Sequence, residues 1–179
     1  MKYKAVVFLT IIFSYSAIGH NNELKNLAEE DQLARTGNVA KRTDEARRQI
    51  VLQLIAKGKV ITSEDKFNAA LILQHTDLKF CDGNLVSSNP ENYLLAHYLF
   101  KSALEGGYEN ARYLVAASID RYLSFTEGYQ RYGTNRIINQ ETGEEELVPI
   151  DRKTSDKERK KYGVPSLKQS LSRYPEQKK

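Results

Sequence analysis

Cysteine, tryptophan and methionine are scarce in this sequence, which has one Cys, no Trp and one Met among 179 residues. Because the only thiol is Cys81, no disulfide can form within the chain, and its stability must come from packing alone. Cys81 is therefore buried, paired with another chain, or free. A nucleophilic role would require a neighbouring base, which the sequence does not place.

Several motifs that identify enzymes are also missing. The sequence has no Gly-rich phosphate loop, no serine-nucleophile elbow and no zinc-protease motif. It has no Cys-x2-Cys pair and no two histidines spaced to bind a metal from one helix, so neither a metal nor a cofactor is expected. Whether the protein is an enzyme is left open by these absences.

Charge of one sign does not dominate either. The chain has 27 Lys and Arg against 23 Asp and Glu, a formal net charge of +4, and the two signs are interspersed. The most basic stretch, residues 152–161, contains Asp156 and Glu158 and is typical of a solvated helix face. We therefore expect the partner to be an unidentified protein or a small-molecule ligand, and not nucleic acid, which attracts more one-sided basic surfaces.

The first residues have the pattern of a secretory signal peptide. Lys2 and Lys4 precede the uncharged apolar run 5–13, and small residues follow at Ala17 and Gly19. The apolar run is shorter than the ~20 residues that cross a membrane, so cleavage after Gly19 is favoured over an uncleaved anchor. This predicts a signal peptide over 1–19, a periplasmic or secreted protein, and no stable membrane anchor after cleavage.

Helical periodicity and capping residues recur through the rest of the chain. Thr43 and Thr62 each precede acidic residues and an apolar periodic segment, which is a typical helix start. The pattern predicts helices over 24–35, 44–57, 62–75, 90–105 and 109–126. The two glycines at 106–107 indicate that the fourth and fifth helices form an antiparallel hairpin.

The segments between and after these helices have a different composition. Residues 76–89 are polar, show no period and are interpreted as a long surface connection. β-Branched runs at 132–138 and 146–150 predict a small β-hairpin with a Thr-Gly turn, followed by two short helices. The sequence thus predicts a mainly α fold: one helical bundle of about five to seven helices over 20–174, a small C-terminal β-hairpin, and a frayed tail over 175–179.

Five short segments together resemble a family of uncharacterised bacterial proteins, a domain of unknown function with an Asp-Arg helix followed by a Gln-x-Tyr-Gly-Thr signature. The signature corresponds here to 119–123 and 130–134, and Asn135 stands where the family pattern has Gln. The other segments are 30–35, 70–75 and 162–167. The resemblance implies a shared fold and a shared pocket, and it implies no activity because none is assigned to the family.

The stretch from Ala96 to Leu114 also resembles one Sel1-like or tetratricopeptide helical pair, with Ala103, Gly107 and Ala111 between. Stacked repeats of this kind need about three units to be stable. Only one unit is present, so an ordinary helical hairpin packed on its neighbours is favoured.

The polar residues of these segments are the candidates for a functional site. If the segments converge, His75 would be a general base oriented by Asp120 or Asp31, and Arg121 would hold an anionic group. The catalytic candidates are His75, Asp120, Arg121 and Tyr132. The binding candidates are Asp31, Gln32, Arg35, Gln74, Gln130, Gly133 and Thr134.

A purely structural role is the alternative for the same residues. Asp31 or Asp120 would then pair with Arg35 or Arg121, while Gln130 and Thr134 would satisfy backbone groups at the junction after the fifth helix. The leading hypothesis from the sequence is therefore a non-enzymatic binding or scaffold protein. A small periplasmic hydrolase or lyase and an inhibitor or immunity protein are the alternatives, and a cleft between the third helix, the fifth helix and the junction would favour the enzyme.

Overall fold

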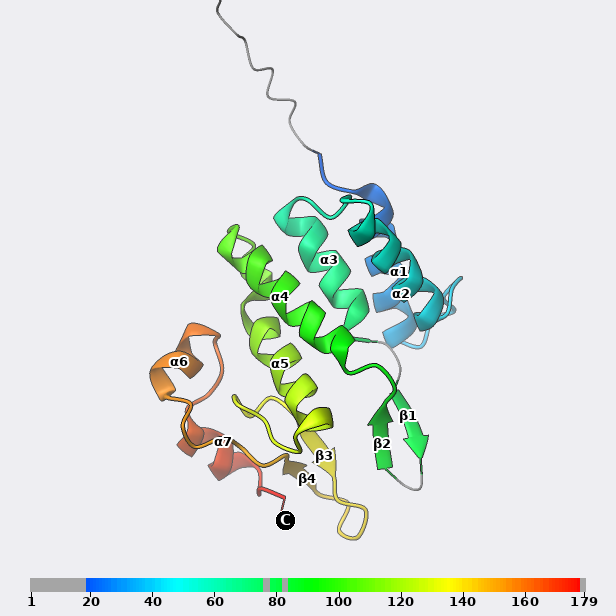
Figure 1. Cartoon of the computed structure of the whole chain (residues 1–179). Helices are drawn as coiled ribbons and strands as arrows, with labels where there is room; N and C mark the ends of the chain where they lie inside the picture. The colour runs from blue at the N-terminus through cyan, green and yellow to red at the C-terminus, as the bar shows by residue number, and fades with distance from the viewer. Residues whose placement is uncertain (1–18, 76–77, 82–83, 178–179) are drawn as a thin grey trace, which may run out of the picture.

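The computed structural model describes residues 19–75, 78–81 and 84–177. Within these residues the chain is mainly α-helical, as Figure 1 shows, with seven α-helices and two small antiparallel sheets. The predicted fold class, a helical bundle with a small C-terminal β-hairpin, is confirmed. The elements in chain order are α1 (Asn22–Arg35), α2 (Asp44–Ala56), α3 (Ser63–Leu73), β1 (Leu78–Cys81), β2 (Asn84–Ser87), α4 (Glu91–Glu105), the short 3-10 helix η1 (Glu109–Ala111), α5 (Arg112–Thr126), β3 (Arg136–Ile138), β4 (Glu145–Leu147), α6 (Asp156–Lys161) and α7 (Leu167–Arg173).

Side-chain caps set where most of the helices begin. The side chain of Asn21 accepts hydrogen bonds from the first backbone N–H groups of α1, and Thr43 does the same for α2. Thr62 forms a reciprocal capping box with Asp65 at the start of α3. Each such cap stabilises a helix by about 1 kcal/mol. The helix starts predicted at Thr43 and Thr62 are therefore confirmed, with their physical cause.

Contacts at the helix ends show that α1 to α5 alternate in direction. The backbone N–H of Asn21 donates to Asp65 at 2.6 Å, which joins the starts of α1 and α3. The hydroxyl of Ser63 donates to the carbonyl of Gly106 at 3.1 Å, which joins the start of α3 to the end of α4. Helices α1 and α3 are consequently parallel neighbours, and α4 runs against α3.

The hydrophobic core lies between these five helices. Large side chains of α1, α2, α3, α4 and α5 are fully buried there, and the ring of Phe67 packs on those of Phe100 and Tyr108, at centroid distances of 5.6 and 4.7 Å. Without a disulfide, burial of this apolar surface is the main favourable term in folding. The buried core residues of largest size are Tyr93, Phe100, Leu24, Leu27, Ile72, Leu73, Val51 and Val115.

The segment between α3 and α4 contains a β-hairpin instead of a structureless connection. Strands β1 and β2 pair antiparallel, with Leu78 opposite Ser87 and Cys81 opposite Asn84. The sequence predicted a long surface connection over 76–89 and did not predict these strands, because strands of four residues are too short to show a clear period. The side chain of Cys81 and residues 76–77 and 82–83 lie outside what the structure describes, so the three expected states of this thiol remain predictions.

The C-terminal hairpin and the tail form a second small sheet. Strands β3 and β4 pair antiparallel around the predicted turn at Thr142 and Gly143, which confirms the expected hairpin. The tail pairs with this hairpin: Leu147 donates to the carbonyl of Pro175 at 2.7 Å, and Gln177 donates to the carbonyl of Leu147 at 2.9 Å. The edge of β4 thus offers residues 175–177 backbone partners that a polar sequence does not reveal. Residues 178–179 lie outside the described part.

Residues 1–18, which carry nearly all of the predicted signal peptide, also lie outside the described part of the chain. Among the helices that the structure describes, none is long and apolar enough to cross a membrane.

One titratable group lies within the packing of α4 on α5. The Nδ1 atom of His97 donates to the carbonyl of Val115 at 2.9 Å, so the proton is on Nδ1. Burial lowers the pKa of His97 below its ordinary 6.5, against the effect of this hydrogen bond. The folded protein therefore binds a proton at His97 less readily than the unfolded chain does.

We predict that the stability of the protein falls as the pH drops below about 6.5, since the unfolded chain then binds a proton at His97 that the folded chain resists. In His97→Gln, which keeps an amide donor but cannot titrate, the free energy of unfolding should fall less between about pH 7.5 and about pH 5. Urea denaturation of both proteins across this range measures the difference. Identical pH dependence in the two would contradict the prediction.

Candidate functional site

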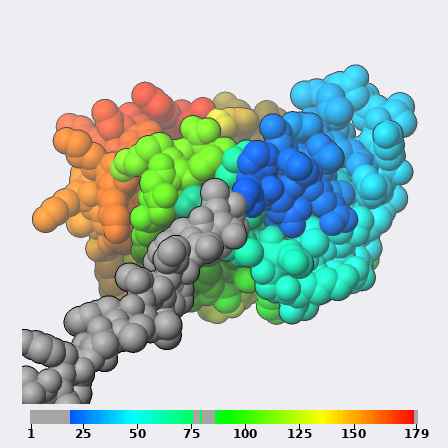
Figure 2. Space-filling model, turned by 90° about the horizontal axis from the view of Figure 1, so that it is seen from above, coloured from blue at the N-terminus to red at the C-terminus, as the bar shows by residue number. Residues whose placement is uncertain are grey.

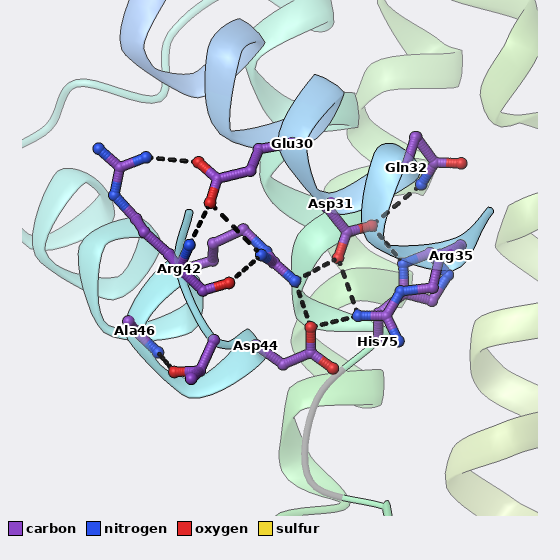
Figure 3. Close-up of polar contacts among 10 residues, drawn as sticks. Glu30, Asp31, Gln32, Arg35, Arg42, Asp44, Ala46 and His75 are labelled. Atoms are coloured by element: carbon purple, nitrogen blue, oxygen red, sulfur yellow. Dashed lines mark hydrogen bonds and ion pairs between the residues drawn. The ribbon is translucent and has the colours of Figure 1, made fainter. Parts of the chain in front are cut away.

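The first of two polar networks joins the C-terminal ends of α1 and α3 to the start of α2, as Figure 3 shows. At its centre the Nδ1 atom of His75 lies 2.6 Å from Oδ2 of Asp31. The Asp31 side chain is 1% exposed, while that of His75 is 20% exposed. When Nδ1 donates to this oxygen, Nε2 is left as the acceptor of the ring.

Cations and an amide hold Asp31 in this orientation. The side chain of Gln32 donates to the same oxygen as His75, at 3.0 Å, and Arg35 and Arg47 approach the other oxygen at 3.5 and 3.6 Å. Arg47 is itself 1% exposed. Two guanidinium groups and one amide therefore surround the buried carboxylate.

Further charges complete this network around Arg47. Its guanidinium contacts Asp44 and Glu30 and donates to the carbonyl of Arg42 at 2.6 Å. Glu30 in turn pairs with Arg42 at 2.5 Å. Removing one partner of the buried Arg47–Asp31 pair would leave an uncompensated charge, which costs about 3–5 kcal/mol. The network therefore fastens α2 to the end of α1.

The second network is centred on Asp120 of α5, whose side chain is fully buried. Its Oδ1 accepts from the backbone N–H groups of Arg131 and Tyr132 at 2.7 and 2.8 Å. Its Oδ2 accepts from the backbone N–H and the hydroxyl of Thr134 at 3.0 and 2.8 Å. The two oxygens of a carboxylate can accept four hydrogen bonds, and Asp120 receives four. Asp120 thereby fixes the shape of the junction that follows α5. Burial raises the pKa of Asp120, against the lowering effect of these hydrogen bonds.

Gln130 and Arg159 bind the backbone of the same junction. The side chain of Gln130 donates to the carbonyls of Asn135 and Val148 at 2.9 and 2.7 Å and accepts from the N–H of Asn135 at 2.7 Å. The buried guanidinium of Arg159 donates to the carbonyls of Tyr132 and Arg131 at 2.6 and 2.9 Å. These contacts satisfy carbonyls that a turn would otherwise leave unpaired inside the protein.

Gly133 and Tyr132 serve the same junction. Gly133 has a φ of +82°, which favours glycine, and a Cβ there would lie 3.0 Å from Cδ1 of Ile150. The Tyr132 ring is buried against Tyr162, and its hydroxyl donates to Glu158 of α6 at 2.7 Å. Burial, followed by this hydrogen bond, raises the pKa of Tyr132 above its ordinary 10. The phenol is therefore a fixed donor.

Arg121 follows Asp120 on α5 and reaches Gln74 beside the first network, but it forms an ion pair with neither Asp31 nor Asp120. It donates to the carbonyl of Gln74 at 2.7 Å, and its guanidinium lies 5.6 Å from the centroid of the Tyr93 ring. Burial lowers the pKa of Arg121. Within the described part of the chain no carboxylate forms an ion pair with Arg121. The Gln74 side chain is buried, and its amide oxygen has no hydrogen-bond partner among the described residues.

The candidate residues therefore divide between two places instead of meeting at one. One group lies at the ends of α1 and α3 and consists of His75, Gln74, Asp31, Gln32 and Arg35. The other group lies toward α6 and consists of Asp120, Tyr132, Gln130, Gly133 and Thr134. Figures 1 and 2 both place α1 and α6 at opposite sides of the molecule. The partner of His75 is Asp31 and not Asp120.

The sequence interpretation missed the two buried arginines that complete these networks. Arg47 shares a helical face with the buried Val51 and Leu54, and Arg159 precedes the buried Tyr162 by three residues. A charged residue at an apolar position of the helical period was the available signal in both cases.

An open groove lies beside the first network, between the parallel helices α1 and α3. Its volume is about 590 Å³, within the range of pockets that bind small molecules or a few side chains. Its surface is mostly apolar, and Gln32 connects one wall to Asp31. The lining residues are Lys25, Ala28, Glu29, Gln32, Leu33, Thr36, Glu64, Asn68 and Leu71. The cleft that would favour an enzyme was expected elsewhere, between α3, α5 and the junction.

A search of the described residues finds no group of three or more His, Cys, Asp and Glu side chains placed to hold a metal ion. Comparison of the chain with protein-family models, with curated proteins and with solved structures found no match. The resemblance to the uncharacterised bacterial family stays a prediction, and function is inferred from geometry.

We predict that Asp120→Asn lowers the free energy of unfolding by roughly 3 kcal/mol, because an amide offers one acceptor oxygen to four donors and leaves buried groups unpaired. Urea denaturation measures this loss, with the exposed Glu144→Gln as the control expected to change stability by less than about 0.5 kcal/mol. A change in Asp120→Asn as small as in the control would show that the carboxylate does not organise the junction.

Proposed function

We propose that this is an exported binding protein that uses the groove between α1 and α3 to hold a segment of a partner protein. The proposal rests on the groove, because an open, largely apolar concavity on a helical scaffold is a typical binding site. The signal-like pattern of the first residues supports export. An inhibitor or immunity protein would be one form of such a binding protein.

The positions of the polar candidates support a binding role over catalysis. Asp120 and Gln130 bind backbone groups of the junction, and the hydroxyl of Thr134 donates to Asp120. These groups have little capacity left for a substrate. Their function is to hold the fold.

The order of the helices supports the same proposal by analogy. α1 and α3 are parallel, with α2 running against α1 between them in sequence, and parallel helices of this kind line the concave faces of helical-repeat proteins. The analogy concerns architecture alone. The Sel1-like resemblance concerns 96–114, in α4 and α5, and remains a prediction.

We predict that a displayed library of random peptides, panned on the purified protein, enriches sequences whose binding is lost in Leu33→Lys. Leu33 lines the groove and is 52% exposed, so a lysine there removes apolar contact without disturbing the core. The matched control is Ile138→Lys on β3, where the replaced side chain is 61% exposed. Peptides that bind the two variants equally well would exclude the groove as the binding site.

A second candidate function is acid-base catalysis by the Asp31–His75 pair, in a small hydrolase or lyase. The observation that favours it is the 2.6 Å contact between a buried carboxylate and a histidine that is partly open to solvent. Such a carboxylate orients the ring and stabilises the imidazolium that forms when Nε2 accepts a proton. The site would then be smaller than the one that the sequence suggested, because it excludes Asp120 and Tyr132.

For this candidate we predict hydrolysis of a nitrophenyl ester faster than in buffer with an equal concentration of free imidazole. The rate should drop at least about tenfold in His75→Gln and should be kept in His97→Gln, where the histidine between α4 and α5 is replaced. A wild-type rate no higher than that of imidazole, or equal rates in the two variants, would eliminate catalysis by this pair and leave the binding role.

A further inference from the structure

The groove between α1 and α3 carries its charges in an uneven arrangement. Glu29 stands on α1 and Glu64 on α3, so each helix contributes one carboxylate to the groove. Among the described residues, Lys25 is the only cation of the lining, and it lies with Glu64 near the end where both helices begin. The apolar side chains Leu33 and Leu71 lie toward the other end.

These three charged side chains are uncommitted within the described part of the chain. Neither Glu29 nor Glu64 forms an ion pair or a side-chain hydrogen bond there, and the same holds for Lys25. The other acidic residues of α1, Glu30 and Asp31, are buried and paired with arginines. The two groove carboxylates are therefore available to a ligand, whereas their neighbours are not.

The direction of the helices places the apolar part of the groove at one end. α1 and α3 run in parallel, so their C-terminal ends lie together there. Leu33 and Leu71 each belong to the last turn of their helix. The partial negative charge of the α1 C-terminus already has Arg35 in the same turn, so Glu29 and Glu64, and not the helix ends, favour positive charge in a ligand.

On the basis of the binding role proposed above, we propose that the ligand of the groove is a basic amphipathic segment of a partner protein. Its apolar side chains pack on Leu33 and Leu71, and its Lys or Arg side chains meet Glu29 and Glu64. This is a helix-in-groove or extended-peptide mode in which apolar anchors supply most of the affinity and the charges select the ligand.

The experiment uses two labelled peptides of equal length and identical leucine positions, one with lysine and the other with glutamate at every polar position. Fluorescence anisotropy measures their binding to the wild-type protein and to the double variant Glu29→Lys/Glu64→Lys. The matched control is Glu141→Lys/Glu144→Lys, which makes the same change in net charge at exposed residues beside the β3–β4 turn. Circular dichroism confirms that all three proteins are folded.

The leucine–lysine peptide should bind the wild type at least about tenfold more tightly than the leucine–glutamate peptide. Charge reversal in the groove should weaken its binding by roughly three- to tenfold, and the control variant should change it by less than about twofold. Equal losses in the two double variants would mean attraction by net charge alone and would overturn the proposed ligand.

The remaining outcomes separate this proposal from the binding role on which it depends. If the leucine–glutamate peptide binds as tightly as its counterpart and Leu33→Lys abolishes both, the groove binds peptides but not by positive charge. If neither peptide binds at roughly millimolar concentration and panning yields no Leu33-dependent sequence, the binding role itself is wrong.

Discussion

The burial of charge is the constraint on which this structure depends. Four ionisable side chains, Asp31, Arg47, Asp120 and Arg159, are almost completely inaccessible to solvent. Taking a charge out of water costs several kcal/mol unless partners replace the lost hydration. Each of the four has such partners: the first pair contacts each other and further ions, and the second pair binds backbone N–H and carbonyl groups of one junction. The two networks fix the end of α1 against α2 and α3, and the junction against α5 and α6.

Much of the fold could be predicted from local signals. Periodicity, caps at Thr43 and Thr62, and glycines after helices placed five helices and the C-terminal hairpin, because these features depend on residues close in sequence. The β1–β2 hairpin and the pairing of the tail with Leu147 could not be predicted in the same way. Both are set by which backbone edge lies nearby in space, and a polar segment such as Pro175-Glu176-Gln177 carries no sign of that edge.

The candidate site was predictable in composition but not in arrangement. The sequence selected Asp120, Gln130 and Thr134 as polar residues with a special role, and the structure gives each of them several short contacts. It could not assign the partner of His75, since Asp31 lies 44 residues earlier and is brought near only by the parallel packing of α1 and α3. The same residue types serve catalysis and structure, so chemistry without geometry could not decide between the two roles.

The polar contacts that hold the fold also prepare the groove. α1 and α3 are joined at one end by the bond from Asn21 to Asp65 and at the other by the contact of Asp31 with His75, and the groove lies between these two fastenings. Walls fixed at both ends lose little conformational freedom when a ligand enters, and this loss is one of the main costs of binding. In the binding role that we propose, the pair that resembles a catalytic dyad fixes the spacing of two helices. Residues that look catalytic would then be essential without contacting a ligand, and the surface that makes the contact would be formed by ordinary residues such as Leu33, Leu71 and Glu29.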